Sequence, residues 1–298
     1  MKNYNREPLV TIGIPFYNPG YFIIDAIRSV FAQTYNNWEL FLIDDGSTDG
    51  IIDIISKIKD PRVHILSDGK NKGLIERLNQ IIQISSGEYI ARMDADDIMH
   101  PERIAKQVAF LESNPNIDVI DTGAIILNKQ GLPIGVKGLE EEPFSIVKIF
   151  KWGTFLHASI MGKRDWFRNN LYDINYHRAE DRELFIRTLT FSNFAHIPEP
   201  LYFYRFEGNV RLKAYLQSYK SERKVLLKYG PKMIGLNYTI YLYARSLLKS
   251  FVLVFLSLLN KENLINKNKY QPLCEIIHNN IKEILEKIHN TEIPGINE

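Results

Sequence analysis

Carboxylates gather at two places in the sequence where an apolar run ends. Asp94, Asp96 and Asp97 follow EYIARM, and Asp44 and Asp45 follow WELFLI. Like charges packed this tightly repel one another, so the first group is typical of a site that holds a cation or stays solvated. Carboxylate oxygens suit Mg²⁺ or Mn²⁺, which in turn bind phosphate oxygens. The first group therefore predicts a metal site, with a solvated acidic turn as the alternative.

The second acidic pair suits an organic ligand. A carboxylate at a strand end can accept hydrogen bonds from a base edge or a ribose hydroxyl, as in dinucleotide-binding folds. Ser47 and Asp49 follow the pair, and helix capping by either residue is the alternative. Tyr17, after another apolar run, has a ring able to cover a base, unless it belongs to the core.

Strands and helices must position these side chains, and residues 9–128 have a regular pattern that predicts such elements. Short apolar runs alternate there with amphipathic stretches, which is typical of βαβ units on a mainly parallel sheet. The polar groups fall where strands end, which is where open α/β sheets bind ligands. The predicted strands are 9–17, 38–45, 63–68 and 88–97, and the predicted helices are 22–31, 49–58, 72–85 and 101–113.

The remaining chain is less regular. A helix is expected near 143–151, a strand at 157–162 and a helix near 179–191, followed by a basic amphipathic helix at 211–229, an apolar segment at 234–260 and a helix at 271–289. Arg245 and Lys249 interrupt the apolar segment, and the uninterrupted run 251–259 is shorter than the ~20 residues that cross a bilayer. We therefore expect no membrane span. Burial against the rest of the protein and docking on a membrane surface are the two alternatives.

Composition excludes several classes of protein. The 298 residues are 45% hydrophobic and 24% charged, which argues against long disorder or a disulfide scaffold. A net charge of +2 is too small for a dedicated nucleic-acid binder. Cys274 is the single cysteine, so an intramolecular disulfide is excluded. The N-terminal MKNYNREPLV lacks the apolar segment of a signal peptide, so we expect a cytoplasmic protein.

Six blocks, in this order, resemble glycosyltransferase family 2, the inverting nucleotide-sugar transferases of GT-A fold. They span about residues 9–206 and read VTIGIPFYN (10–18), FLIDDGSTD (41–49), NKGLIERLNQ (71–80), GEYIARMDADDIMHPERI (87–104), HASIMGKRDWF (157–167) and AEDRELFIR (179–187). The resemblance implies an α/β fold with a Rossmann-like, mainly parallel sheet and flanking helices. It also implies a catalytic domain at 1–210, with a nucleotide-sugar-binding half at 9–128 and an acceptor-side half at 129–206, and a helical extension at 211–298.

The resemblance further implies a donor site with a divalent metal, manganese or magnesium. The implied metal ligands are Asp94 and Asp96, of which Asp96 is the better candidate. The implied donor contacts are Pro15, Tyr17 and Asn18 at the nucleoside, Asp45 at the base with Asp44 close by, Arg77 and Asn79 near the ribose and diphosphate, and Asp94, Ala95 and Asp96 of the DxD motif.

On the acceptor side, the resemblance implies that Asp181 is the catalytic base, with Glu180 and His157 nearby. Outside the family context, Glu180 and Asp181 are typical of first-turn helix carboxylates, and His157 is equally typical of a buried core residue. Many family members place a histidine after the segment that matches LYFYR (201–205). Glu207 stands near that point here, so the third metal contact is open.

The predicted activity is a metal-assisted single displacement from a nucleotide-diphosphate sugar, UDP-linked by preference, to a hydroxyl of a glycan or lipid-linked acceptor in bacterial surface polysaccharide synthesis. No nucleic acid is expected as a partner, whereas peripheral contact of the C-terminal helices with the inner face of the cell membrane is. The alternatives are a sugar nucleotidyltransferase and a non-catalytic nucleotide-sugar-binding module. A dehydrogenase is disfavoured, since G-x-G-x-x-G is missing after the first strand.

Overall fold

The computed structural model describes residues 7–140, 145–153, 155–206, 211–261, 264, 270–273 and 275–296. The strands are β1 (Val10–Phe16), β2 (Trp38–Asp44), β3 (Val63–Ser67), β4 (Tyr89–Arg92), β5 (Ile98–Met99), β6 (Val119–Leu127), β7 (Pro133–Lys137), β8 (Met161–Lys163) and β9 (Phe194–Arg205). The helices are α1 (Phe22–Phe31), α2 (Ile51–Ile55), α3 (Leu74–Ile84), α4 (Arg103–Ser113), α5 (Ile146–Trp152), η1 (a 3-10 turn, His157–Ser159), α6 (Arg164–Asn169), α7 (Glu180–Thr188), α8 (Leu212–Met233), α9 (Leu236–Leu258) and α10 (Glu275–His289).

The strands form one nine-stranded sheet in the order β3-β2-β1-β4-β8-β6-β9-β5, with β7 beside β6. The pairs among β1 to β4 are parallel, whereas β8 runs antiparallel to both β4 and β6. The α/β prediction with a Rossmann-like core is confirmed, and its parallel part consists of β1 to β4, while β6 and β9 form a second parallel pair. The sheet as a whole is mixed, because β5, β7 and β8 pair antiparallel with their neighbours.

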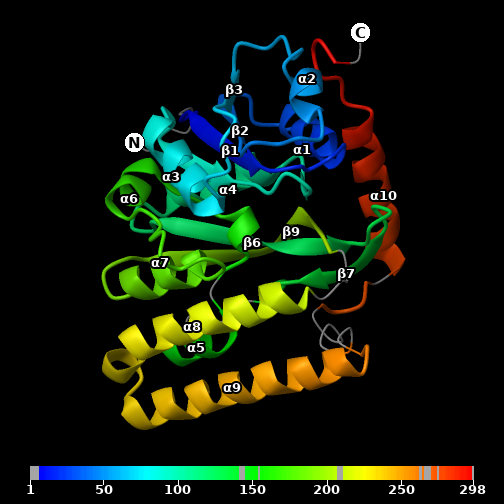
Figure 1. Cartoon of the computed structure of the whole chain (residues 1–298). Coiled ribbons are helices and arrows are strands. Elements are labelled where there is room, and N and C mark those ends of the chain that lie inside the picture. The colour runs from blue at the N-terminus through cyan, green and yellow to red at the C-terminus, as the bar shows by residue number, and fades with distance from the viewer. Residues whose placement is uncertain are drawn as a thin grey trace.

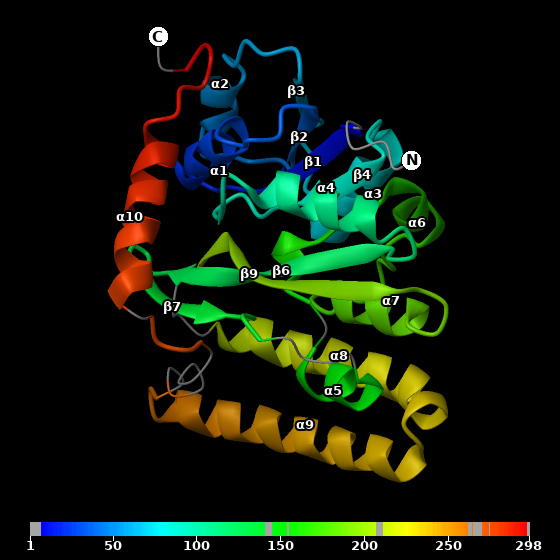
Figure 2. The same cartoon turned by 180° about the vertical axis from the view of Figure 1, so that it is seen from behind.

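Helices cover both faces of the sheet (Figures 1 and 2). Successive residues of β2 point to opposite faces, as the pleat requires. Leu40 and Leu42 enter a core with α1, α2 and α4, whereas Phe41 and Ile43 enter a second core with α3, α6 and α7. Burial on both faces explains why this strand reads as a continuous apolar run rather than an alternating one.

The C-terminal helices divide between two places. Helices α8 and α9 lie side by side below the sheet (Figure 1), where Val225 and Leu242 pack with Ile186 of α7. Helix α10 returns to the N-terminal half and lies along α1 (Figure 2). There Leu285 joins the cluster that contains Phe203. The division of the chain at residue 211 stays a prediction.

The structure differs from the expected elements at several places. The strand expected at 88–97 ends at Arg92, and β6 and β7 have no counterpart among the expected elements. The strand expected at 157–162 begins as η1 and becomes β8 only at Met161, because the Ser159 N–H donates to the Leu156 carbonyl (2.8 Å) and closes a turn. Helix α2 is shorter than 49–58, since Gly50 at its N-cap is left-handed (φ 78°) and delays its start. The long strand β9 has no counterpart among the expected elements. Its partner β6 lies about 75 residues earlier, as in the pair Asp121–His196, and such distant pairing leaves no local signal.

Helix α9 extends well beyond the nine-residue run, to 23 residues, and by length and composition it is the one helix of the described chain able to cross a bilayer. The expectation of no membrane span stays a prediction. Burial explains one face only: Thr239, Leu242 and Leu253 are buried. Most of its other apolar side chains are exposed.

Candidate active site

The loops that follow β1 and β2 are bonded to each other at the carboxyl edge of the sheet. Asn18, in the left-handed region at φ 49°, accepts a hydrogen bond from the Thr48 N–H (2.7 Å), and its own N–H donates to Ser47 Oγ (2.9 Å). Pro15 is buried in β1, whereas Tyr17 is 53% exposed. The ring of Tyr17 is therefore exposed at this edge, and the alternative that Tyr17 belongs to the core is wrong.

Asp44 fixes the loop after β2. Its carboxylate accepts hydrogen bonds from the Ser47 N–H (2.8 Å) and from Ser67 Oγ of β3 (2.6 Å). Burial by itself raises the pKa of Asp44, but these hydrogen bonds outweigh it and lower the pKa below its ordinary value. Asp44 is thus an ionised positioning residue, and Ser47 is committed to Asn18 and Asp44 rather than to capping α2.

Asp45 and Arg77 form a buried ion pair. Arg77 is only 1% exposed, and its Nε donates to Asp45 Oδ1 (2.9 Å) while Nη2 donates to Asp68 Oδ1 (2.6 Å). The same Asp45 carboxylate accepts the backbone N–H groups of Lys72 (2.7 Å) and Gly73 (3.0 Å). Asp45 therefore orders the loop that leads into α3. Its predicted contact with a nucleotide base stays a prediction.

Asn79 lies two residues farther along α3, and its side chain has other partners. Its Nδ2 donates to the Tyr172 carbonyl and its Oδ1 accepts the Tyr172 N–H, both at 2.9 Å. The described contacts of Asn79 therefore position the segment before α7. The predicted donor contact of Asn79 stays a prediction.

The acidic loop after β4 is held by basic and aromatic side chains that sequence reasoning missed. Arg92 is buried, and its Nη2 donates to Asp94 Oδ1 (2.6 Å). From β9, Tyr202 Oη accepts the Asp94 N–H (3.1 Å), and Arg205 donates its Nε–H to the Asp96 carbonyl (2.8 Å) and its N–H to Asp97 (2.7 Å). The segment LYFYR (201–205) contains Tyr202 and Arg205, but only the pairing of β9 brings these two residues to the acidic loop.

This loop fits a hard divalent cation. Burial raises the pKa of Asp97 well above its ordinary value, and the charges of Asp94 and Asp96 raise it further, so the loop lies in a negative potential. One oxygen of Asp97 is buried without a hydrogen-bond partner. The described residues contain no group of three His, Cys, Asp or Glu side chains placed to hold a metal. A cation here would therefore need oxygen ligands from a substrate or water, which Mg²⁺ commonly takes.

Asp181 and Glu180, in the first turn of α7, have different environments. Glu180 is 8% exposed, and burial raises its pKa, with a further contribution from Asp181. Asp181 lines two adjoining cavities, of about 1010 Å³ and 720 Å³, whereas Glu180 lines neither. Of the two carboxylates, Asp181 is the one placed to meet a ligand.

His157 lies in the wall of the larger cavity and is half-buried, with its ring beside those of Tyr172 and Phe185. Its Nε2 shares a hydrogen bond of 2.8 Å with Tyr172 Oη. Burial holds the pKa of His157 well below its ordinary value, and the charge of Arg92 lowers it further. A neutral imidazole follows, so both predicted roles, core residue and acceptor-side residue, are compatible with this position.

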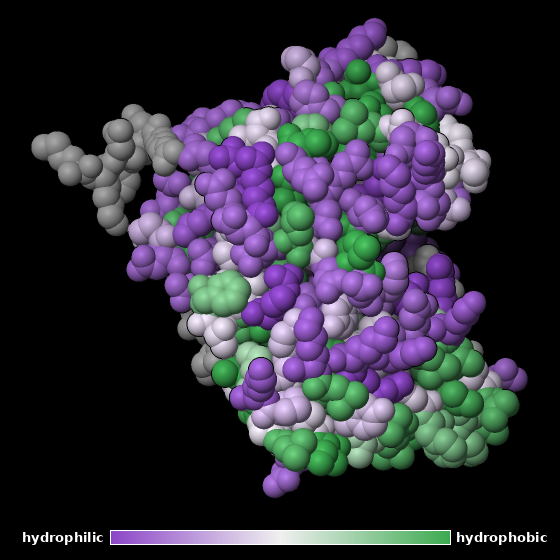
Figure 3. Space-filling view, turned by 60° about the vertical axis from the view of Figure 1, so that its left-hand side comes forward, coloured by the Kyte–Doolittle hydropathy of each residue, from purple (hydrophilic) through white to green (hydrophobic). Residues whose placement is uncertain are grey.

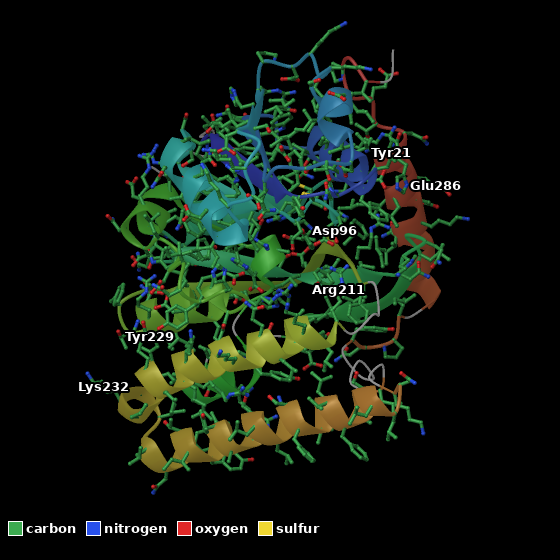
Figure 4. The ribbon with its side chains drawn as sticks, viewed as in Figure 1. Tyr21, Asp96, Arg211, Tyr229, Lys232 and Glu286 are labelled. Atoms are coloured by element: carbon green, nitrogen blue, oxygen red, sulfur yellow. The ribbon has the colours of Figure 1, made fainter. Side chains whose placement is uncertain are left out.

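The larger cavity brings together some of the predicted residues. Its wall includes the predicted residues Asp94, His157 and Asp181, together with Arg92. Other predicted residues lie outside its lining: Tyr17, Asp45, Arg77, Asn79 and Asp96. Asp96 lies near the centre of the molecule, above the start of α8 marked by Arg211 (Figure 4). Glu207, named for the third metal contact, lies outside the described residues.

Comparisons with known proteins give a family and a fold. The family model described as glycosyl transferase family 2 matches residues 11–185. A protein named as a glycosyltransferase, EpsE of Bacillus subtilis, is 30% identical over 257 residues, which are 83% of this chain and 91% of EpsE. WcaA of Escherichia coli, named for colanic acid biosynthesis, is 31% identical over 63% of this chain and 67% of its own length.

Solved structures agree in fold at low sequence identity. TarS of Staphylococcus aureus (residues 1–349), in complex with UDP-GlcNAc, has a TM-score of 0.62 at 16% identity and covers 80% of this chain and 71% of that one. A Pyrobaculum calidifontis mannosyltransferase, in complex with GDP-Man and Mn²⁺, has a TM-score of 0.57 at 14% identity over 96% of this chain and 86% of its own. The GT-A prediction is confirmed by these neighbours.

Proposed function

Because this chain belongs to glycosyltransferase family 2, we propose that it transfers one sugar from a nucleotide-diphosphate donor to an acceptor hydroxyl, with inversion at the anomeric carbon. Family members named for bacterial polysaccharide biosynthesis support a bacterial surface glycan as the product. We propose a UDP-linked donor, in line with the UDP-GlcNAc bound by TarS, and an acceptor that is a glycan or is lipid-linked. The proposed location is the cytoplasmic face of the cell membrane.

One observation supports this reaction most directly: Asp94 and Asp181 line the same cavity. In the proposed step, an acceptor oxygen bonds to the anomeric carbon and its proton moves to the Asp181 carboxylate. The bond from the anomeric carbon to the phosphate oxygen breaks, and its electron pair leaves with the nucleoside diphosphate. One carboxylate is enough for this displacement, because the diphosphate leaves without being protonated and no second carboxyl group has to act as a general acid.

On the donor side, we propose that Tyr17 covers the base, that Asp45 accepts a hydrogen bond from it, and that Arg77 orients Asp45 through the hydrogen bond from its Nε. Asp94 and Asp96 would hold a divalent cation, which when bound offsets the charge that grows on the departing diphosphate. Arg92 meanwhile neutralises Asp94, to which it is bonded at 2.6 Å. These roles make the acidic loop part of donor binding and Asp181 part of the chemical step.

The test is Asp181→Asn, which keeps the size of the side chain and removes the basic oxygen. Screening nucleotide sugars by thermal stabilisation first identifies the donor. We then expect Asp181→Asn to bind that donor with nearly native affinity and to lose about 10²–10⁴-fold in turnover. Asp53→Asn, on the exposed surface of α2, is the matched control and should keep native turnover. Near-native turnover by a folded Asp181→Asn protein would refute the assignment and favour a non-catalytic donor-binding role for this carboxylate.

A further inference from the structure

Helix α9 presents a long apolar face to solvent. The exposed side chains include Leu248, Phe251, Phe255 and Leu258, with exposures up to 78% at Leu258. Apolar side chains gather at the lower end of the molecule, where α9 lies (Figure 3). Solvent-exposed apolar patches of this extent mark a surface that meets another apolar phase.

The only charged residues of α9 are Arg245 and Lys249. They are four residues apart and therefore lie on one side of the helix, where like charges repel. Partial burial lowers the pKa of Lys249, and the nearby charge of Arg245 lowers it further. The charge of Glu222 on α8 acts in the opposite direction on Lys249. A further anion beside the two side chains would be attracted by both cations.

This cation pair faces the cavity of the catalytic base. Arg245, Leu248, Lys249 and Val252 line one side of the 1010 Å³ cavity, and Asp181 lines it as well. Leu248 and Val252 belong at the same time to the exposed apolar face of α9. The cavity therefore runs from a carboxylate that would meet a sugar, past two cations, to an apolar helix surface.

Hydrogen bonds and an ion pair fix the spacing between these parts. Arg182, next to Asp181, pairs with Glu222 of α8 at 3.3 Å. Arg223, next to Glu222, donates from Nη1 to the hydroxyls of Ser246 (3.1 Å) and Ser250 (2.9 Å) on α9. Ser246 and Ser250 are the neighbours of Arg245 and Lys249. The cation pair is thus held at a set distance from Asp181 across three helices.

We propose that Arg245 and Lys249 bind the phosphate of a lipid-linked acceptor, whose hydrocarbon chain lies along the exposed face of α9 while its sugar hydroxyl reaches Asp181. This inference rests on the proposed function and specifies its acceptor class. Arginine and lysine are the side chains that bind phosphate groups. An apolar face beside cationic side chains is also the arrangement of helices that lie in the interface of a membrane.

Charge favours a lipid over a second copy of this chain as the occupant of this face. Helix α8, packed against α9, carries further exposed lysines, at Lys213, Lys220, Lys224 and Lys232. A symmetric pairing of two such surfaces would bring cations together, since a twofold interface repeats the same patch on both sides. A membrane surface that carries phosphate groups has the opposite charge and can bury the apolar side chains.

The experiment measures binding of the full chain to vesicles by flotation. Phosphatidylcholine vesicles carry either a long-chain isoprenyl phosphate or the matching uncharged isoprenyl alcohol, and a third set carries phosphatidylglycerol. We expect the isoprenyl phosphate vesicles to bind the wild type most tightly. Loss of two charge-assisted contacts in Arg245→Gln/Lys249→Gln should weaken that binding by about tenfold or more. Lys224→Gln/Lys232→Gln removes the same charge outside the cavity and should retain it.

Three results would overturn the proposal: equal losses in the two double variants, equal binding to the phosphate and alcohol vesicles, or equal binding to the phosphatidylglycerol vesicles. The single variant Lys249→Gln, at an exposed position, keeps the test valid if the double variant misfolds. Titration with UDP separates this proposal from the function it rests on. Native nucleotide affinity with phosphate-independent vesicle binding refutes only the acceptor site, whereas a wild type that binds no nucleotide sugar refutes the proposed function.

Discussion

Replacing Asp45 by alanine should destabilise the protein before any donor is added. The substitution removes the Asp45 partner of a buried guanidinium and the acceptor of the Lys72 and Gly73 N–H groups. Breaking a buried ion pair costs about 3–5 kcal/mol when the remaining charge is left without compensation. Arg77 keeps Asp68 as a second partner at 2.6 Å, so we expect the lower end of that range, about 3 kcal/mol.

The loss is measured as the free energy of unfolding in urea, with the melting temperature as a second readout. A loss of about 3 kcal/mol corresponds to a fall of about 6–12 °C in a protein of this size class. Asp53→Ala, at an exposed position of α2, is the control and should stay within about 0.5 kcal/mol of the wild type. The affinity for UDP, measured well below the melting temperature, should also fall if Asp45 accepts a hydrogen bond from the nucleotide base.

A double-mutant cycle with Arg77→Ala isolates the pair itself. Because the two side chains are in direct contact, the two losses should not be additive, and the double variant should be less destabilised than their sum. The reasoning fails if Asp45→Ala unfolds with the wild-type free energy, or if the two single losses add. Either result would mean that Asp68 alone satisfies the buried guanidinium.

Three further perturbations test other parts of the site. Chelation by EDTA, or Asp96→Ala, should abolish donor-dependent turnover, and full activity in excess EDTA would refute the metal assignment. Burial lowers the pKa of His196, but its bond to Asp121 (2.7 Å) outweighs this and raises the pKa above 6.5. Burial also raises the pKa of Asp121. Stability from this pair is therefore complete between the raised pKa of Asp121 and pH 6.5, and it is lost as the pH rises through the raised pKa of His196, a dependence that His196→Asn should remove in urea unfolding. Asn79→Ala leaves the Tyr172 N–H and carbonyl without their partner and should cost about 1–3 kcal/mol, with UDP affinity unchanged if Asn79 only positions that segment.

Local sequence signals were enough to predict the N-terminal half of the fold. Strands β1 to β4 and helices α1, α3 and α4 follow from apolar runs, helical spacing and turn residues, all of which act within a few positions. The positions of Asp44, Asp45, Asp94 and Asp96 at strand ends were predictable for the same reason. The partners that these carboxylates contact within the protein were not predictable. Asp45 and Arg77 are 32 residues apart in the sequence. Each could be identified as a candidate site residue, but the ion pair between them could not be predicted.

The C-terminal helices show another limit of sequence reasoning. The helical spacing of apolar residues in α10 predicts a helix. This spacing does not indicate that the helix returns to the N-terminal half and packs on α1. The apolar composition of α9 fits both burial and membrane contact, and only the packing of α8 against one of its faces separates the two. In the sequence, Arg245 and Lys249 only interrupt an apolar segment. Their position beside the cavity supports the phosphate-binding role that we propose for them, and this position depends on the packing of three helices.

Strand β9 explains why the geometry of the site could not be read from its motifs. Near its C-terminal end, Tyr202 and Arg205 hold the acidic loop through the Asp94 N–H and the Asp96 carbonyl. Near its other end, His196 pairs with Asp121, whose second oxygen accepts the Leu156 N–H (2.8 Å) directly before His157. A single strand therefore positions both the donor-side carboxylates and the segment on the acceptor side. Because β9 pairs with β6 and β5 over long separations, the distance between the two sides depends on tertiary pairing and not on the spacing of residues within either motif.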